Sequence, residues 1–362
     1  MGFWQGTLED LAMSPDFWRN RSVFLTGHTG FKGGWIALWL SQLDAQVHGY
    51  SLAPPTTPNF FTATRLHDRL QTATVADIRV LPKLAAAMQV AQPSIVIHMA
   101  AQPLVRESYN TPAETFATNV IGTVNVLEAV RQVGTVQAVV NITTDKCYEN
   151  QEWVWPYREG DRLGGHDPYS SSKACAEIAA AAYRDSFLAE AGIQLASVRA
   201  GNVIGGGDWA TDRLIPDFLS AIDAGEVLRI RSPNAVRPWQ HVLEPLSGYL
   251  MLAERLVTDG AEFAEAWNFG PEEFDAKSVS WVVERLSQKF PHARSELEGT
   301  QQPHEASLLK LDSSKAKTRL GWAPRWSLEK ALDKTIEWHQ AWKDGLSMAE
   351  ISIEQIEQYQ AA

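Results

Sequence analysis

Residues 22–33 read Ser-Val-Phe-Leu-Thr-Gly-His-Thr-Gly-Phe-Lys-Gly. Residues 22–26 predict a short buried strand, because the four that follow Ser22 are apolar or β-branched. Gly27, Gly30 and Gly33 follow at a spacing of three, and an apolar helical pattern continues from them. A strand, a glycine turn and a helix N-terminus in this order can hold a pyrophosphate, because free backbone N–H groups and the helix dipole attract anions. The stretch therefore predicts the start of a dinucleotide-binding fold, although G-x-x-G-x-x-G is not the commoner G-x-G-x-x-G.

Strand-like and helix-like segments alternate from this stretch to about residue 203. The strand candidates, which are rich in Val, Ile and Thr, are 22–27, 46–52, 71–76, 94–100, 136–144 and 193–199. Helical patterns lie between several of them, at 32–45, 79–91, 113–133 and 169–191. This alternation predicts an α/β fold with a doubly wound parallel sheet of the Rossmann type.

The pattern changes after residue 203, where helical patterns at 213–224, 244–257, 278–290 and 327–344 occur with few clear strands. We expect a smaller, mostly helical C-terminal substrate domain made of residues 204–236 and 271–345. Residues 18–203 would form the dinucleotide-binding domain, to which the chain returns within 237–270, near Trp239–Val242 and Trp267–Gly270.

Composition narrows the class of protein. The chain has 362 residues, of which 45% are hydrophobic and 21% charged, as in globular proteins, and its net charge of −11 argues against nucleic acid or an anionic membrane as a partner. Two cysteines, Cys147 and Cys175, exclude a disulfide scaffold, fit a reducing, cytoplasmic compartment and show no metal-ligand spacing. Residues 1–20 lack the pattern of a signal peptide, and no apolar run is long enough to span a bilayer.

Two short motifs carry candidate chemistry. Tyr169 and Lys173 are four residues apart at the start of an Ala-rich helical pattern, so they share one helix face. The lysine charge would favour the phenolate and make Tyr169 a base. Thr144, Asp145 and Lys146 follow the strand at 136–144, and the carboxyl ends of parallel strands share one edge of the sheet. We therefore expect both motifs beside the glycine turn.

With these motifs the chain resembles the extended short-chain dehydrogenase/reductase family, over about residues 18–342. The resemblance is carried by 26–35, 49–52, 98–105, 144–148 and 199–209. The Thr144-Asp145-Lys146 triplet and the Gly-Gly-Gly-Asp-Trp loop at 205–209 are most similar to the CDP-glucose 4,6-dehydratase branch. The related dTDP-glucose dehydratases carry Glu where this chain has Lys146.

The resemblance implies a reaction on CDP-glucose with NAD as cofactor. Tyr169 would take the proton from the sugar O4 while C4 gives hydride to NAD, and Lys173 would hold Tyr169 ionised and bind the nicotinamide ribose. Thr144 would hydrogen-bond the O4 region. Asp145 would protonate the leaving 6-hydroxyl and Lys146 would remove the C5 proton, although this division between the two is open. The hydride then returns to C6, so water is lost and NAD is regenerated.

The resemblance also implies binding residues. The cofactor contacts would be Gly27, Thr29, Gly30, Phe31, Lys32 and Gly33 at the pyrophosphate, Asp77 and Ile78 at the adenine, and Ala100, Ala101 and Gln102 at the nicotinamide-side ribose. Asn119 either faces this cleft or packs between helices. The substrate contacts would be Asn202, Arg213, Arg237 and His304, within a wider arginine cluster that includes Arg229 and Arg231. Independently of the resemblance, the position of Trp209 in the glycine loop at 205–209 predicts that it lies near the substrate.

Neither a carboxylate nor an arginine follows the strand at 46–52, so NAD rather than NADP rests on the resemblance. The choice of CDP also rests on it, as does a homodimer formed by the helices at 113–133 and 169–191. A nucleotide-sugar 4-epimerase, which would use Tyr169, Lys173 and Thr144 but no acid–base pair at 145–146, stays open. So do a dehydratase acting on another nucleotide sugar, such as GDP-mannose, and a non-catalytic dinucleotide sensor.

Overall fold

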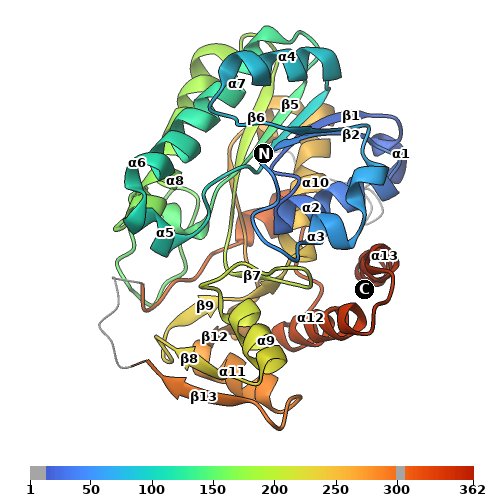
Figure 1. Cartoon of the computed structure of the whole chain (residues 1–362). Helices are drawn as coiled ribbons and strands as arrows, with labels where there is room; N and C mark the ends of the chain where they lie inside the picture. The colour runs from blue at the N-terminus through green and yellow to red at the C-terminus, as the bar shows by residue number, and fades with distance from the viewer. Residues whose placement is uncertain (1–13, 299–305) are drawn as a thin grey trace.

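The computed structural model describes residues 14–298 and 306–362. A seven-stranded parallel sheet crosses the molecule in the order β11-β6-β5-β4-β1-β2-β3 (Figure 1). Its strands are β1 (Ser22–Thr26), β2 (Gln46–Ser51), β3 (Thr72–Val75), β4 (Ile95–His98), β5 (Ala138–Ile142), β6 (Gln194–Ala200) and β11 (Ala266–Phe269). The predicted doubly wound α/β fold is confirmed.

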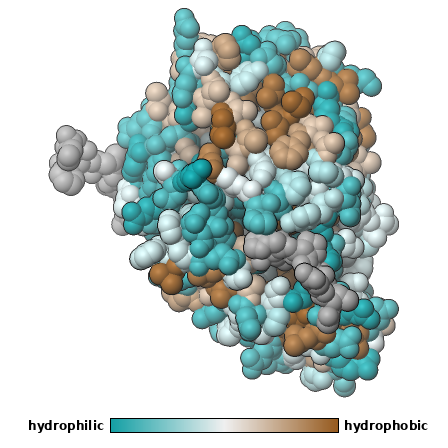
Figure 2. Space-filling view, turned by 90° about the vertical axis from the view of Figure 1, so that its left-hand side faces the viewer, coloured by the Kyte–Doolittle hydropathy of each residue, from teal (hydrophilic) through white to brown (hydrophobic). Residues whose placement is uncertain are grey.

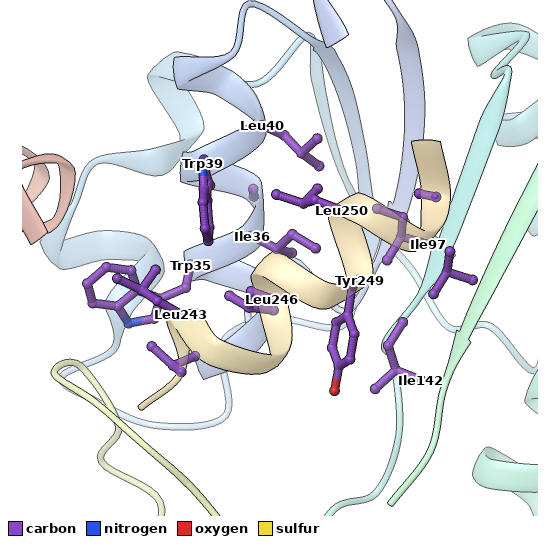
Figure 3. Packing of buried hydrophobic residues seen from close by; sticks show 14 of the residues in the cluster. Trp35, Ile36, Trp39, Leu40, Ile97, Ile142, Leu243, Leu246, Tyr249 and Leu250 are labelled. Carbon is purple, nitrogen blue, oxygen red and sulfur yellow. The ribbon is translucent and has the colours of Figure 1, made fainter. Parts of the chain in front are cut away.

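Helices cover both faces of the sheet. Each strand contributes side chains to both faces, because its successive side chains point in opposite directions. Val23 and Leu25 of β1 belong to one hydrophobic cluster, to which α2 (Phe31–Gln42) and α10 (Leu243–Thr258) contribute. Figure 3 shows Trp35 and Trp39 of α2 beside residues of α10 in this layer. Phe24 belongs to the cluster on the other face, which α4 (Leu81–Ala91), α7 (Gly122–Gln132) and α8 (Pro168–Tyr183) cover.

The helix α8 begins at a defined point, and this start positions Tyr169 and Lys173. Asp167 is its N-cap, where Oδ1 accepts a hydrogen bond from the backbone N–H of Ser170 at 2.9 Å. Pro168 occupies the first helical position, where a missing N–H costs nothing. Both long helical patterns of the sequence contain π-turns, η3 (Ala117–Ile121) between α6 (Pro112–Phe116) and α7, and η5 (Arg184–Leu188) after α8.

The second lobe lies below the carboxyl edge of the sheet in Figure 1 and contains α9 (Leu214–Ala224), α11 (Val279–Ser287) and α12 (Leu328–Lys343). Three two-stranded sheets accompany them: β7 (Val203–Ile204) with β10 (Gln240–His241), β9 (Val236–Pro238) with β12 (Ala276–Ser278), and β8 (Val227–Ile230) with β13 (Arg294–Leu297). The expected return of Trp239–Val242 to the main sheet is wrong, since β10 pairs with β7. The later segment does return, because β11 pairs with β6.

Helix α13 (Met348–Gln360) lies beyond the helical patterns that the sequence indicated, and packs against α2 and α12. The remaining elements are short: α1 (Pro15–Trp18), α3 (Phe60–Ala63), η2 (Leu66–Arg69), α5 (Val105–Asn110), η4 (Asp145–Cys147), η6 (Gly260–Phe263), η7 (Glu273–Asp275) and η8 (Ala316–Leu320). Within the described residues, no helix is both long enough and apolar enough to span a bilayer.

Candidate active site

The glycine turn between β1 and α2 leaves no room for side chains at two positions. Gly27 has a φ of +81°, and a Cβ there would lie 2.8 Å from the backbone nitrogen of Ala100. A Cβ on Gly33 would lie 2.0 Å from the carbonyl oxygen of Gly27. Thr29 joins the turn to the end of β2, since its Oγ1 donates to the carbonyl of Leu52 at 2.9 Å. The turn is therefore a fixed, open backbone cradle of the kind that a pyrophosphate occupies.

The predicted adenine side follows β3. The carboxylate of Asp77 accepts two hydrogen bonds from Nε of Arg79, at 3.0 and 2.9 Å, so this acidic side chain is already paired. Its ion pair with Arg79 holds the pKa of Asp77 below the usual range. Ile78 is buried against Gly122 of α7. The structure thus places both residues at the same edge of the sheet as the glycine turn.

The segment after β4 is held by buried hydrogen bonds. Oγ1 of Thr26 accepts from the backbone N–H groups of Met99 and Ala100, at 3.1 Å each. Asn119, on η3, accepts from the backbone N–H of Gln102 at 2.8 Å and donates to the Gln102 carbonyl and to Oγ of Ser172, at 3.1 and 2.9 Å. Of the two readings of Asn119, the geometry favours packing, because its side chain fastens the 100–102 segment to α8. Ala100, Ala101 and Gln102 are half-buried.

The turn after β5 carries the Thr-Asp-Lys triplet. Thr144 caps η4, and its Oγ1 donates to Oδ1 of Asp145 at 3.1 Å. Asp145 is 2% exposed, and its burial raises the pKa of its carboxyl group above the usual value. Among residues 14–298 and 306–362, Oδ2 of Asp145 has no hydrogen-bond partner. Lys146 is half-buried beside it. A buried carboxyl group with a raised pKa is suited to donate a proton.

Tyr169 and Lys173 lie close to this turn, but the lysine is not the main influence on the phenol. Burial raises the pKa of Tyr169 to about 12, against the opposing effect of a hydrogen bond with Thr144. Nζ of Lys173 donates to the carbonyl of Ile142 at 3.1 Å. Burial, together with the charge of Lys32, lowers the pKa of Lys173 to about 8. Desolvation is the largest effect on the pKa of Tyr169, so the favourable effect of Lys173 on the phenolate stays a prediction.

A cavity of about 540 Å³ opens between the sheet edge and the second lobe. Its lining includes Phe31, Lys32, Thr144, Asp145, Lys146, Tyr169, Asn202, Arg213 and Arg237. Lys32 faces the proposed catalytic groups, since the charges of Asp145 and Arg213 both act on it, and burial lowers its pKa to about 8. The structure thus brings Lys32, predicted at the pyrophosphate, into the same cavity as the triplet.

The wall on the side of the second lobe is cationic. Nη1 of Arg213 pairs with Oδ2 of Asp208 at 2.7 Å, and Arg237 is 3% exposed. Arg106 and Arg231 both line the cavity and share Oδ1 of Asp212, at 2.9 and 2.8 Å. The sequence analysis did not predict Arg106 as a site residue, although Arg106 directly follows residues 98–105, which carry part of the family resemblance. In the described part of the chain, no cluster of three His, Cys, Asp or Glu side chains could hold a metal ion.

Trp209 does not line this cavity but contacts the rings of Trp338 and Trp342 on α12, with centroids 5.6 and 5.2 Å away, so its place near the substrate stays a prediction. The glycine loop before it turns the indole toward the hydrophobic core. His304 lies outside the described residues.

Comparison with known proteins identifies the family. The family model described as GDP-mannose 4,6 dehydratase matches residues 24–335. The chain belongs to this family. It is 53% identical to CDP-glucose 4,6-dehydratase of Salmonella typhimurium, over 97% of this chain and 99% of that protein.

Proteins of known structure share the fold. UDP-glucose 4-epimerase of Thermotoga maritima, solved with UDP-glucose, superposes with a TM-score of 0.76 at 22% identity, over 89% of this chain and 99% of that one. dTDP-glucose 4,6-dehydratase of Bacillus anthracis, solved with NAD, gives 0.74 at 21% identity, over 91% and 99%. The fold therefore accommodates both epimerases and dehydratases, and the choice between them rests on the site.

Proposed function

We propose that this chain is an NAD-dependent CDP-glucose 4,6-dehydratase, a hydro-lyase that converts CDP-glucose to CDP-4-keto-6-deoxyglucose and water. The observation that carries the proposal is that Asp145, a buried carboxyl group with a raised pKa, lines the same cavity as Tyr169. A 4-epimerase needs a base at O4 but has no use for an acid beside it. The 53% identity to the Salmonella dehydratase over nearly the whole of both chains supports the same choice.

The chain offers a site that fits NAD. Gly27, Thr29, Gly30 and Gly33 would surround the pyrophosphate, because the absent side chains leave the backbone N–H groups accessible. Asp77 and Ile78 would contact the adenine, and Ala100, Ala101, Gln102 and Lys173 the nicotinamide side. When bound, NAD accepts the hydride from C4 of the sugar and later gives it back to C6, so none is consumed.

The first half of the reaction belongs to Tyr169. Its phenolate would take the proton of the sugar O4, which Thr144 orients by a hydrogen bond. Since burial raises the pKa of Tyr169 to about 12, positive charge must help it to ionise. The charge of Arg213 already acts in this direction, and Lys173 lies one helical turn away on the same face. Once C4 is a ketone, the C5 proton becomes acidic.

The second half belongs to Asp145 and Lys146. Asp145 would give its proton to the 6-hydroxyl, so that the C6–O6 bond breaks and water leaves. Lys146 would remove the C5 proton, and the electron pair forms the C5–C6 double bond; Lys146 would return this proton to C5 when the hydride adds to C6. Asp145 suits the acid role because its burial disfavours the carboxylate.

The second lobe would hold the nucleotide diphosphate. A sugar placed with C4 at Tyr169 puts its diphosphate toward Asn202, Arg213 and Arg237, which line the cavity on that side. Arginine suits this purpose, because its planar donors match phosphate oxygens in pairs. Under this proposal residues 18–203, with the return near 267–270, bind NAD, and residues 204–236 and 271–345 bind the nucleotide sugar.

The test is to incubate the purified chain with CDP-, dTDP- and UDP-glucose and NAD, and to follow the 4-keto-6-deoxy product by mass spectrometry and NMR. We expect the largest kcat/KM with CDP-glucose. Turnover of another nucleotide sugar without turnover of CDP-glucose contradicts the substrate assignment. A 4-epimer in place of a dehydrated product contradicts the reaction itself.

We further propose a homodimer. Phe116 of α6, Ile121 of η3, Ile178 of α8 and Phe187 of η5 are exposed apolar side chains, with Ile121 and Ile178 more than half exposed. Figure 2 views the molecule from the side on which α6 and α8 lie in Figure 1, and shows hydrophobic residues gathered on the upper part of this face. A second copy would cover them.

A cytoplasmic location is also proposed, because Cys147 and Cys175 are both unpaired thiols.

A further inference from the structure

Tyr249 has no role in the proposed dehydration, yet its position is unusual. It lies on α10 and is fully buried, with its ring against Phe269 at a centroid distance of 5.6 Å. Figure 3 shows its hydroxyl at the level of Ile142, the last residue of β5. Within residues 14–298 and 306–362, this hydroxyl has no hydrogen-bond partner.

Asp145, three residues after Ile142, also carries an unsatisfied polar atom. Its Oδ2 is buried and has no hydrogen-bond partner in the described part of the chain. The two groups influence each other. Burial raises the pKa of Tyr249 far above its usual value, and the negative charge of Asp145 raises it further. Two unsatisfied buried polar atoms therefore lie within electrostatic reach of each other, near the end of β5.

An unpaired buried hydroxyl destabilises a fold. Phenylalanine would fill the same space beside Phe269 without this cost, since it differs from tyrosine by the hydroxyl alone. The position therefore indicates that the hydroxyl has a partner during function, and Oδ2 of Asp145 is a buried acceptor that lacks a donor.

We propose that Tyr249 is a positioning residue that donates a hydrogen bond to Oδ2 of Asp145, directly or through one water molecule. This inference rests on the proposed function, in which Asp145 gives its proton to the 6-hydroxyl as water leaves and becomes a carboxylate. Tyr249 then stabilises that carboxylate. Asp145 later recovers a proton from solvent, and Tyr169 releases to solvent the one taken from O4.

Other groups also act on Asp145 and must be separated from Tyr249. Lys146 and Thr144 are its neighbours in the chain, Arg237 reaches it from β9, and Lys32 from α2; all four favour the carboxylate. Tyr169 of α8 and the thiol of Cys147 also interact with it. A Tyr249→Phe substitution leaves these groups in place and removes one neutral donor, so the expected change is a further rise in the pKa of Asp145.

The experiment compares Tyr249→Phe with the wild-type protein. We expect dehydration of CDP-glucose to slow by about 10- to 100-fold, which is the effect expected from losing one hydrogen bond to a charged group. The basic limb of the kcat profile should move to higher pH, because a weaker acid keeps its proton longer. The Tm should be unchanged or higher. An unchanged pH profile overturns the inference.

Tyr359→Phe is the matched control. The hydroxyl of Tyr359 is buried but already donates to Oε2 of Glu244 at 2.7 Å, far along the chain from the triplet. Its removal should lower the Tm and leave the pH profile in place.

A second readout does not depend on catalysis. In protein with ¹³C-labelled aspartate, the carboxyl signal of Asp145, assigned by its loss in Asp145→Asn, is titrated in the wild type and in Tyr249→Phe. A higher pKa in the variant supports the link, and equal values contradict it. If the wild type fails to dehydrate CDP-glucose, the proposed function fails, while this titration still decides the pairing of the two residues.

Discussion

Gly33 and Gly30 differ in the space that the surrounding backbone leaves for a side chain. A Cβ at Gly33 would lie 2.0 Å from the Gly27 carbonyl oxygen, whereas one at Gly30 would lie 3.4 Å from the same atom. We expect Gly33→Ala to lower the affinity for NAD at least tenfold and to reduce the Tm, because the turn must open. Gly30→Ala should change both much less. Isothermal titration with NAD measures the difference, and equal effects would contradict the steric argument.

Lys146 can be tested apart from Asp145. We expect Lys146→Ala to leave C4 oxidation intact but to slow exchange of the C5 proton with solvent deuterium by about 10²- to 10⁴-fold, the usual contribution of a general base. Mass spectrometry of the recovered sugar follows the exchange. Asp145→Asn is the comparison, since it should block loss of water while exchange continues. Exchange at the wild-type rate in Lys146→Ala would assign the base elsewhere.

At the residue scale, the sequence predicted the groups whose position follows from topology. Thr144, Asp145 and Tyr169 line one cavity, because β5 ends and α8 begins at the carboxyl edge of the sheet. Tyr249 was not predictable, because it comes from a helix more than 100 residues later. The orientation of Trp209 was not predictable either, because it depends on contacts with α12 that no local pattern encodes.

At the element scale, β6 is joined to α8 by a buried ion pair behind the triplet. Arg199 forms two hydrogen bonds to Glu177, at 2.9 and 3.0 Å, and both side chains are less than 5% exposed. Thr143 Oγ1 also donates to Glu177, at 2.5 Å. The pair therefore fixes the start of the catalytic turn against the helix that carries Tyr169.

Removing one partner should leave an uncompensated buried charge. We expect Arg199→Met to lower the free energy of unfolding by about 3–5 kcal/mol. The double variant Glu177→Leu with Arg199→Met should recover part of this loss, because it leaves neither charge buried alone. Urea denaturation followed by circular dichroism measures both. If the double variant loses as much free energy of unfolding as the two single variants together, the two residues act independently.

The long elements were predictable and the short ones were not. All six strands expected before residue 203 occur. Nearly every residue of β1, β4, β5 and β6 is buried, as in strands that are covered on both faces. Strands such as β7 and β10 have two residues each, too few for an alternating pattern. They exist because the second lobe brings them together, which is tertiary information.

At the scale of the whole molecule, the exposed face of α6, η3 and α8 leads to a prediction about assembly. We expect a dimer in solution, and we expect Ile121→Glu with Ile178→Glu to convert it to a monomer, because a buried unpaired carboxylate opposes association. Light scattering after size-exclusion chromatography gives the mass. Val90→Glu on α4 is the control, since Val90 is 83% exposed but lies on another helix. A monomeric wild type, or a dimeric double variant, would contradict the proposed interface.

Helix α13 docks on the rest of the molecule through a buried carboxyl group. Glu244 is fully buried on α10 and accepts hydrogen bonds from the backbone N–H groups of Arg325 and Trp326 and from the hydroxyl of Tyr359, which lies on α13. Burial nevertheless raises the pKa of Glu244 to about 7, since desolvation exceeds the effect of these donors. The attachment of the last helix is therefore coupled to pH.

The sign of this coupling follows from proton counts. Between about pH 4.5 and 7 the folded chain keeps the Glu244 proton that the unfolded chain has released, so the free energy of unfolding falls as pH rises through this window, by about 3 kcal/mol in total. Buried His98 and His241, whose pKa values are lowered to about 3, act in the opposite direction below pH 6.5. The pH dependence of the wild-type free energy of unfolding therefore combines both effects. We expect Glu244→Gln to become more stable relative to the wild type from pH 4.5 to 8, measured by urea denaturation at each pH. A stability difference that does not change with pH would show that Glu244 keeps an ordinary pKa.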